Sequence, residues 1–152
     1  MNTQQDIEDI FSILHDGTIE SYIGNKNKLT LKISCVYLAE QINKSFEYFY
    51  VELTEIDILE LFTWRSLMEE EQQTLINLKD IFKFELEIID ANIEDNIVII
   101  TCKLDNKYET FHGGNLKLNC KEIKVFDQNK TQLTIEKFRE NCNQYWDSFG
   151  NA

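Results

Sequence analysis

Apolar and polar side chains alternate along much of this chain, and that alternation limits the available folds more than any other feature. Leu29, Leu31, Ile33 and Cys35 occupy one face of an extended segment, and the polar residues between them, Thr30, Lys32 and Ser34, occupy the other. A period of two is typical of a β-strand with one buried and one solvated face. The tetrapeptide Gly-Asn-Lys-Asn just before this segment supplies turn residues, so residues 18–35 predict a β-hairpin.

The same alternation recurs through the rest of the chain and predicts an antiparallel sheet. Further strands are predicted at residues 46–53, 56–62, 81–89, 97–104, 107–111, 116–119 and 123–126. Turns are predicted between them at residues 54–55, 94–96, 113–115 and 127–130. Two segments, residues 37–44 and 67–79, fit either a short helix or an irregular connection.

Helical spacing occurs at the two ends of the chain. Thr3 and Asp6 have capping-box spacing, and the apolar residues that follow recur every three or four positions: Ile7, Ile10, Phe11 and Leu14. Gly17 is placed to end this helix in a left-handed conformation. Near the C-terminus, Thr134 can cap a second helix, whose apolar stripe comprises Phe138, Cys142, Tyr145, Trp146 and Phe149. We therefore expect one α+β domain over residues 1–152, mainly antiparallel β, with N- and C-terminal helices.

The two halves of the chain have similar strand patterns. Leu31–Cys35 aligns loosely with Ile99–Lys103, and Val51–Ile58 aligns better with Leu116–Val125. These pairs lie at nearly equal separations along the chain. The similarity favours two related β-meanders that pack into a two-layer core, although any two alternating strands share this pattern.

Negative charge is concentrated in the middle third of the chain. The net charge is −12, and residues 40–95 carry fifteen acidic and four basic side chains, a local net of −11. Such an imbalance attracts a cationic partner and repels nucleic acid and anionic membranes. It indicates a class of partner and does not name a reaction.

Composition favours a cytoplasmic protein without a cofactor. The segment Met1–Asp6 is polar and acidic, unlike a secretory signal, and the longest apolar run, Ile97–Ile100, is too short to span a bilayer. The four cysteines lack C-x-x-C spacing and fit reduced, mostly buried thiols. Because the sequence contains no phosphate-binding glycine loop and no calcium loop, we expect no cofactor and no metal.

The two histidines and the many carboxylates are the candidates for catalysis. His15-Asp16 fits a helix-end turn better than a metal-dependent hydrolase pair, which needs more ligands. His112, beside two glycines, fits a turn better than a general base on a flexible loop. Two carboxylates could serve a glycosidase, but a solvated acidic face is commoner. An enzyme of unrecognised type, with a hydrolase-like carboxylate and histidine site, therefore stays an alternative.

Tyrosines beside carboxylates provide the candidate partner-binding residues. Alternation over residues 46–53 buries Phe49 and Val51 and exposes two tyrosines. Tyrosine rings and carboxylates together suit Lys and Arg side chains, through cation–π contacts and ion pairs. The predicted site comprises Tyr48, Tyr50, Glu52, Glu55, Asp57 and Glu60. An equally simple explanation of the tyrosines is that strands favour them.

Two segments resemble parts of small uncharacterised bacterial proteins, some of which are immunity proteins of polymorphic toxin systems. They are Leu14–Ile19, which leads into the predicted hairpin, and Leu133–Phe138 with the later Tyr145-Trp146. The resemblance implies a compact, non-catalytic protein that binds and blocks a toxin. It carries over no functional residues, because such families recognise their partners through variable surfaces.

Our leading hypothesis is a non-catalytic cytoplasmic binding protein, such as an immunity protein that neutralises a basic toxin by occlusion. Besides an enzyme, the other alternative is an oligomeric structural or scaffold protein whose acidic face only confers solubility. The leading hypothesis requires the acids of residues 40–95 to converge into a docking surface. Lysines of the same chain that neutralise those acids would count against it.

Overall fold

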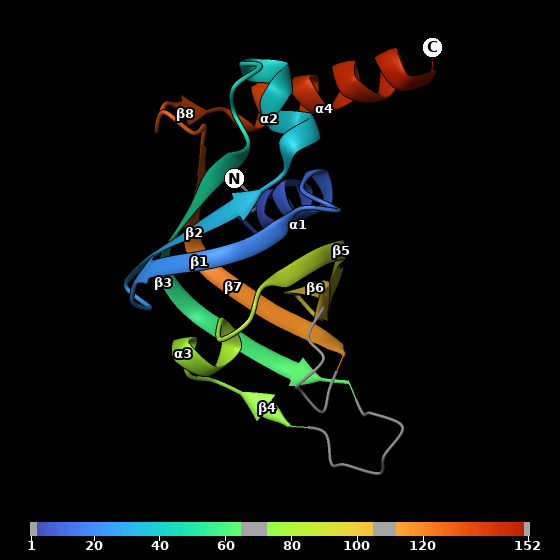
Figure 1. The fold of residues 1–152 in the computed structure, drawn as a ribbon. Helices are drawn as coiled ribbons and strands as arrows, with labels where there is room; N and C mark the ends of the chain where they lie inside the picture. The colour runs from blue at the N-terminus through green and yellow to red at the C-terminus, as the bar shows by residue number, and fades with distance from the viewer. Residues whose placement is uncertain (1–2, 65–72, 105–111, 151–152) are drawn as a thin grey trace.

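Residues 3–64, 73–104 and 112–150 are described by the computed structural model, and they form an α+β fold (Figure 1). In chain order the elements are α1 (Thr3–Ile13), β1 (Thr18–Gly24), β2 (Lys28–Ser34), α2 (Val36–Ile42), β3 (Tyr48–Thr63), β4 (Thr74–Leu75), α3 (Leu78–Ile81), β5 (Leu86–Glu94), β6 (Ile97–Leu104), β7 (Gly113–Phe126), β8 (Gln132–Leu133) and α4 (Ile135–Gly150). The strands pair in antiparallel fashion between an N-terminal and a C-terminal helix, which confirms the predicted fold class. Across the described residues, every helix is too short or too polar to cross a membrane.

Six of the strands close into a small barrel. Strands β1, β2 and β3 form one meander, and β5, β6 and β7 form a second. The meanders meet along β3 and β7, which pair over most of their length, and along β1 and β5, which pair only at Thr18–Glu87 and Ile19–Leu86. The two-residue strands β4 and β8 add to the ends of β3 and β7. Closure pairs the edges that an open sheet would leave exposed.

The two predicted meanders are therefore present, and they form a closed ring instead of two separate layers. The segments with similar sequence patterns occupy equivalent places in the ring. Strands β2 and β6 are the middle strands of their meanders, and β3 and β7 are the last. A common origin of the two meanders stays a prediction.

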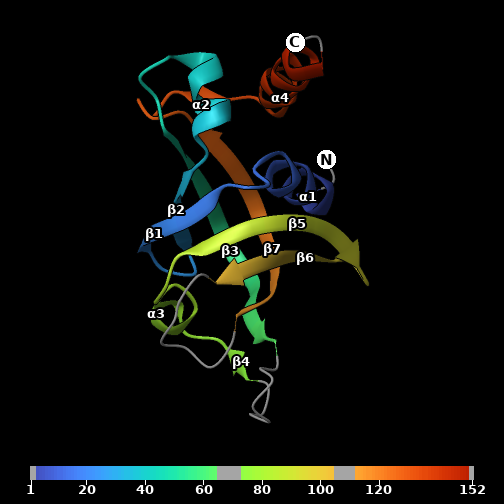
Figure 2. The ribbon, with the colours of Figure 1, turned by 45° about the vertical axis from the view of Figure 1, so that its right-hand side comes forward.

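Helix α1 packs against the second meander and closes off part of the core (Figure 2). Its apolar face, formed by Ile7, Ile10, Phe11 and Leu14 at its end, is fully buried, as the helical spacing predicted. Each of these side chains contributes about 1.5–3 kcal/mol by leaving water. The hydroxyl of Ser12 also donates a hydrogen bond to a carbonyl oxygen of β5, at 3.3 Å.

Helix α4 is anchored by Phe138 in its first half and by Tyr145 and Trp146 in its second half, whose rings pack against Tyr37 and His15. The Thr134 hydroxyl oxygen accepts a hydrogen bond from the Lys137 amide at 3.1 Å, which confirms the predicted cap. Phe138 is fully buried, and its ring meets the Phe49 ring edge-on, with 5.1 Å between centroids. Figure 1 shows the C-terminal end of α4 extending past the body of the molecule, and Trp146 is still 41% exposed.

The predicted break at residues 54–55 is wrong, because a bulge carries the chain onward as the single strand β3. Glu55 adopts a φ of 50°, and the register with β7 shifts between Ile56 and Ile58. The amides of Glu55 and Ile56 donate to carbonyl oxygens of the β1–β2 turn, both at 2.8 Å. The bulge redirects β3 just beyond its pairing with Lys28, the first residue of β2, and pairing with β7 continues beyond the bulge.

The predicted turn at residues 113–115 is also wrong, and so is the break after residue 119, since residues 113–126 form the one strand β7. A Cβ atom on Gly113 would lie 2.4 Å from the carbonyl oxygen of Cys102, so glycine serves close strand approach here. At the end of α1, the left-handed residue is Asp16, with a φ of 68°, and not Gly17.

The structure also assigns most of the two segments that fitted either a short helix or an irregular connection. Residues 37–44 contain most of α2, and residues 73–79 contain β4 and the start of α3. The strand predicted from residue 81 begins only at Leu86, because Ile81 still belongs to α3. The strand predicted at 107–111 and the residues 67–72 lie outside the described residues.

Candidate partner-binding surface

The outer face of β3 carries three of the six predicted site residues close together. Tyr48, Tyr50 and Glu52 are partly exposed, whereas Phe49 and Val51 between them are buried in the core. This confirms the alternation expected for residues 46–53. Strand β2 flanks this part of β3 on one side and β7 on the other, so the face extends over three strands.

Lysines lie over both tyrosine rings. The rings of Tyr48 and Tyr50 are 5.5 Å apart between centroids and nearly perpendicular, at 84°. The Nζ atom of Lys32 lies 4.3 Å from the centroid of the Tyr48 ring, and that of Lys130 lies 5.5 Å from the Tyr50 centroid. The neighbouring Tyr50 is the main cause that raises the pKa of Tyr48. The rings therefore already have cation–π contacts within the chain.

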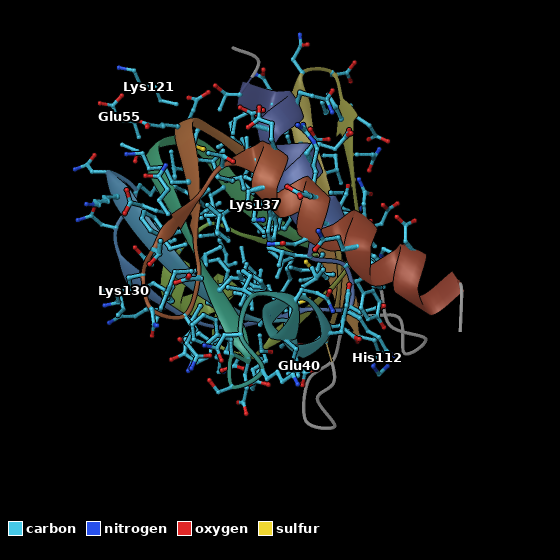
Figure 3. The ribbon with its side chains drawn as sticks, turned by 90° about the horizontal axis from the view of Figure 1, so that it is seen from above. Glu40, Glu55, His112, Lys121, Lys130 and Lys137 are labelled. Atoms are coloured by element: carbon cyan, nitrogen blue, oxygen red, sulfur yellow. The ribbon has the colours of Figure 1, made fainter. Side chains whose placement is uncertain are left out.

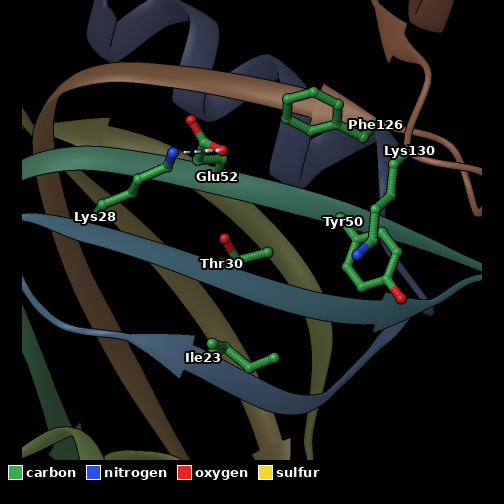
Figure 4. Close-up of a pocket in the computed structure, with 7 residues that line it drawn as sticks. All are labelled: Ile23, Lys28, Thr30, Tyr50, Glu52, Phe126 and Lys130. Carbon is green, nitrogen blue, oxygen red and sulfur yellow. Dashed lines mark ion pairs between the residues drawn. The ribbon is translucent and has the colours of Figure 1, made fainter.

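A hollow of about 340 Å³ opens beside Tyr50 (Figure 4). Its lining comes from β1, β2, β3, the end of β7 and the turn that follows: Ile23, Lys28, Thr30, Tyr50, Glu52, Phe126 and Lys130. Ile23 is 76% exposed, so an apolar side chain is available at the hollow without further movement. A hollow with apolar walls and a few polar groups is the usual form of a binding site.

The turn after β7 holds Lys130 in position. Asp127 is 7% exposed, and its Oδ1 atom accepts hydrogen bonds from two amides of the turn, at 2.9 and 3.0 Å. The side-chain oxygen of Gln128 accepts a hydrogen bond from the Glu47 amide at 2.7 Å, which ties the turn to the start of β3. The ammonium over Tyr50 is thus presented by an ordered turn.

Lysines of the same chain face two of the predicted acids. The Nζ atom of Lys28 lies 3.8 Å from Oε2 of Glu52, and the Nζ atom of Lys121 lies 3.3 Å from Oε2 of Glu55. Figure 3 shows Glu55 and Lys121 together at one edge of the molecule. Both pairs are partly or largely exposed, so each contributes only about 0–1 kcal/mol to stability.

The last two predicted acids lie beyond the bulge, away from the tyrosines. Glu60 stands opposite Lys117 in the register of β3 with β7. Asp57 is exposed, and no cationic side chain of the described residues lies within ion-pair distance of it. The six residues therefore form two groups on a surface of mixed charge. On this described face, the acids do not converge into the unneutralised surface that the hypothesis required.

Sequence reasoning missed the lysines and the apolar groups of the hollow. Lys28 and Thr30 lie on the polar face of the predicted hairpin, and Phe126 and Lys130 lie beside and within the predicted turn. The position of each of these four residues in its own segment could be predicted from the sequence. The register that brings the hairpin, β3 and the end of β7 together depends on barrel closure, which no single segment specifies.

His15 serves packing at the end of α1. Its ring stacks on that of Trp146, at 5.6 Å between centroids and an interplanar angle of 13°. Its Nδ1 atom lies 2.8 Å from the carbonyl oxygen of Ser12, and Asp16 is 3.9 Å from Nε2. The other histidine, His112, is exposed at the start of β7. Neither lines the hollow.

The thiols are poor nucleophiles where they stand. Burial raises the pKa of Cys35 and Cys102 to about 12 and that of Cys120 to about 11, and it also raises the pKa of Cys142. All four are therefore protonated at neutral pH. Within the described ranges, no group of three or more His, Cys, Asp or Glu side chains is placed to hold a metal ion.

Comparison of the chain with protein-family models, curated proteins and solved structures gives no match.

Proposed function

We propose that this chain is a non-catalytic binding protein that docks a partner protein on the outer face of β2, β3 and β7. The observation that carries the proposal is the hollow beside Tyr50, where aromatic rings, lysines and a carboxylate meet on an otherwise regular sheet face. Tyrosine contributes strongly to protein interfaces, because it buries a large rigid ring at a low entropy cost. Charges of both signs around it favour one docked orientation over others.

The partner we propose is a basic protein, such as a toxin that the bound chain would neutralise by covering its active surface. The net charge of −12 supports this choice. An acid paired with a lysine adds no net charge, so the excess of acids over lysines still acts at long range. In this proposal the overall field speeds the encounter, and the tyrosine face fixes the docked position.

The lysine pairs change the role that we assign to the acids. Glu52 and Glu55 already face Lys28 and Lys121, so they are not unpaired anchors that wait for a cation. An exposed pair costs only about 0–1 kcal/mol to break. The Glu55 carboxylate, whose pair with Lys121 is largely exposed, can therefore exchange this lysine for a cation of the partner at little cost.

Affinity capture from a native lysate of the source organism tests the proposal. The unaltered chain is compared with the double variant Tyr48→Ala/Tyr50→Ala and with Phe62→Ala, which removes another exposed ring at the far end of the same strand. We expect the unaltered chain and Phe62→Ala to retain the same basic protein. The double variant should bind it at least about tenfold more weakly, since loss of two interface anchors costs more than about 1.4 kcal/mol.

Two results would contradict the proposal. One is that no basic protein is retained above background at low salt. The other is that the double variant retains the captured protein as well as the unaltered chain does. Sedimentation at several concentrations separates a scaffold, which would self-associate, from a binding protein that waits for a different partner.

A further inference from the structure

Lys130, at the edge of the hollow, is a cation without an anionic partner among the described residues. No carboxylate of the residues that the structure describes lies within ion-pair distance of its Nζ atom, which instead lies over the Tyr50 ring. The hydrogen bonds of Asp127 fix the turn that carries it. An ammonium that a fixed turn presents beside an aromatic wall suits an anionic group, because little backbone freedom is lost when that group binds.

Lys28 supplies a second cation, and Glu52 limits how much negative charge the hollow accepts. The Lys28 side chain is 67% exposed, and 3.8 Å is long for an ion pair with Glu52, so Lys28 is free to turn toward a ligand. The Glu52 carboxylate is only 18% exposed and lines the same hollow. It would repel a second negative charge. The hollow therefore suits one carboxylate and opposes a polyanion.

The remaining lining is largely apolar. Figure 4 shows the Lys28–Glu52 pair toward one end of the hollow and Lys130 with Tyr50 toward the other. Phe126 lies beside the second group. A volume of about 340 Å³ accommodates a pair of side chains and not a folded element.

We infer that the hollow receives an acidic side chain of a partner protein, with the carboxylate against Lys130 and a neighbouring apolar or aromatic residue against Tyr50 and Phe126. The inference rests on the proposed binding role and names the chemistry of one contact within it. A protein with a net positive charge still carries individual acidic residues, so this contact is compatible with a basic partner. Nucleic acid, the other common anionic ligand, is opposed by Glu52 and by the net charge of −12.

Titration with two capped dipeptides, followed by amide NMR of the full chain, tests the inference without a known partner. The first probe is N-acetyl-aspartyl-phenylalanine amide, and the second replaces aspartate with the neutral, nearly isosteric asparagine. We expect the aspartyl probe to shift the amides of Thr30, Tyr50 and Lys130 and to bind about 1.5- to fivefold more tightly than the asparaginyl probe, the usual effect of one exposed ion pair.

Two variants assign the effect to the hollow. Lys130→Met keeps an aliphatic chain over Tyr50 and removes the charge, so it should abolish the preference for the aspartyl probe. Lys137→Met, on α4 and well separated from Lys130 in Figure 3, is the matched control and should leave the preference unchanged.

Several outcomes would overturn the inference. They are equal binding of the two probes, shifts centred away from the hollow, no shift up to the solubility limit, and a preference that survives in Lys130→Met. Inorganic phosphate that binds as tightly as the aspartyl probe would also overturn it, because the hollow would then be an unselective anion site. If the probes bind as expected but lysate capture fails, the carboxylate contact in the hollow is supported and the proposed docking function is contradicted. If capture succeeds but the probes do not bind, only this inference falls.

Discussion

The Nζ atom of Lys130 lies 5.5 Å from the centre of the Tyr50 ring, although the two residues belong to different halves of the chain. This contact exists because the barrel closes between β3 and β7, which places the turn after β7 over the outer face of β3. The closure thus creates both the stable core and the surface that we propose as the docking site.

Asp127→Ala should loosen this surface and destabilise the fold. The buried carboxylate accepts two amide hydrogen bonds, and its loss leaves those amides unpaired. We expect the free energy of unfolding to fall by about 1–3 kcal/mol in urea titrations. Asp127→Asn keeps an acceptor oxygen and should recover most of the loss. Equal losses in the two variants would show that the acceptor geometry is not what matters.

Phe138→Ala should weaken the attachment of α4 to the barrel. The ring is fully buried against Phe49, so its removal leaves a cavity and should lower the free energy of unfolding by about 3–5 kcal/mol. The matched control is Phe62→Ala, whose ring is 36% exposed and should cost much less. Chemical denaturation of both variants measures the difference, and similar losses would refute the anchoring role.

Stability should fall at alkaline pH in a way that depends on Cys102. Its pKa is raised to about 12 by burial, whereas a free thiol titrates near about 8.5. Between these values the unfolded chain loses a proton that the folded chain keeps, so this thiol favours unfolding increasingly as the pH rises. From about pH 8 to about pH 10.5, the unaltered chain should lose about 2 kcal/mol more than Cys102→Ala. If the free energy of unfolding falls equally with pH in the unaltered chain and in Cys102→Ala, burial does not raise the pKa of this thiol.

Gly24→Ala should disrupt the β1–β2 turn. Gly24 has a φ of +110°, and a Cβ atom there would lie 2.1 Å from the Lys28 carbonyl oxygen. We expect a loss of more than about 1 kcal/mol, from strain and from the clash. Asn27→Ala in the same turn serves as the control, because its backbone groups stay in place. A thermal unfolding midpoint for Gly24→Ala that matches the control would argue against this strained turn.

Local patterns predicted the elements well where one segment carries the whole signal. The spacing of Ile7, Ile10 and Phe11 gave α1, and the Gly-Asn-Lys-Asn turn gave the first hairpin. Local patterns wrongly predicted turns at residues 54–55 and 113–115. Polar residues there form a bulge, and glycine allows close approach of the neighbouring strand, within a long strand. A turn and a bulge use the same residue types, and only the partner strand distinguishes them.

The candidate site was predictable only in part, for the same reason. Alternation placed Tyr48 and Tyr50 on the outer face, but pairing decided which charges surround them. Glu52 and Glu55 looked like part of one anionic segment in the sequence, and β2 and β7 bring lysines to both. Net charge along a segment does not give net charge on a surface, because neighbouring strands come from distant parts of the chain.

The association rate of the captured basic partner, measured in increasing salt, tests the central claim most directly. From about 0.05 M to about 0.5 M salt the rate should fall steeply, because screening removes the long-range attraction of the acidic chain. Asp57→Lys reverses an exposed charge that has no ion-pair partner in the described residues. At low salt, the association rate of this variant should be lower than that of the unaltered chain. A rate that is independent of salt and unchanged by this reversal would contradict a docking protein for a basic partner.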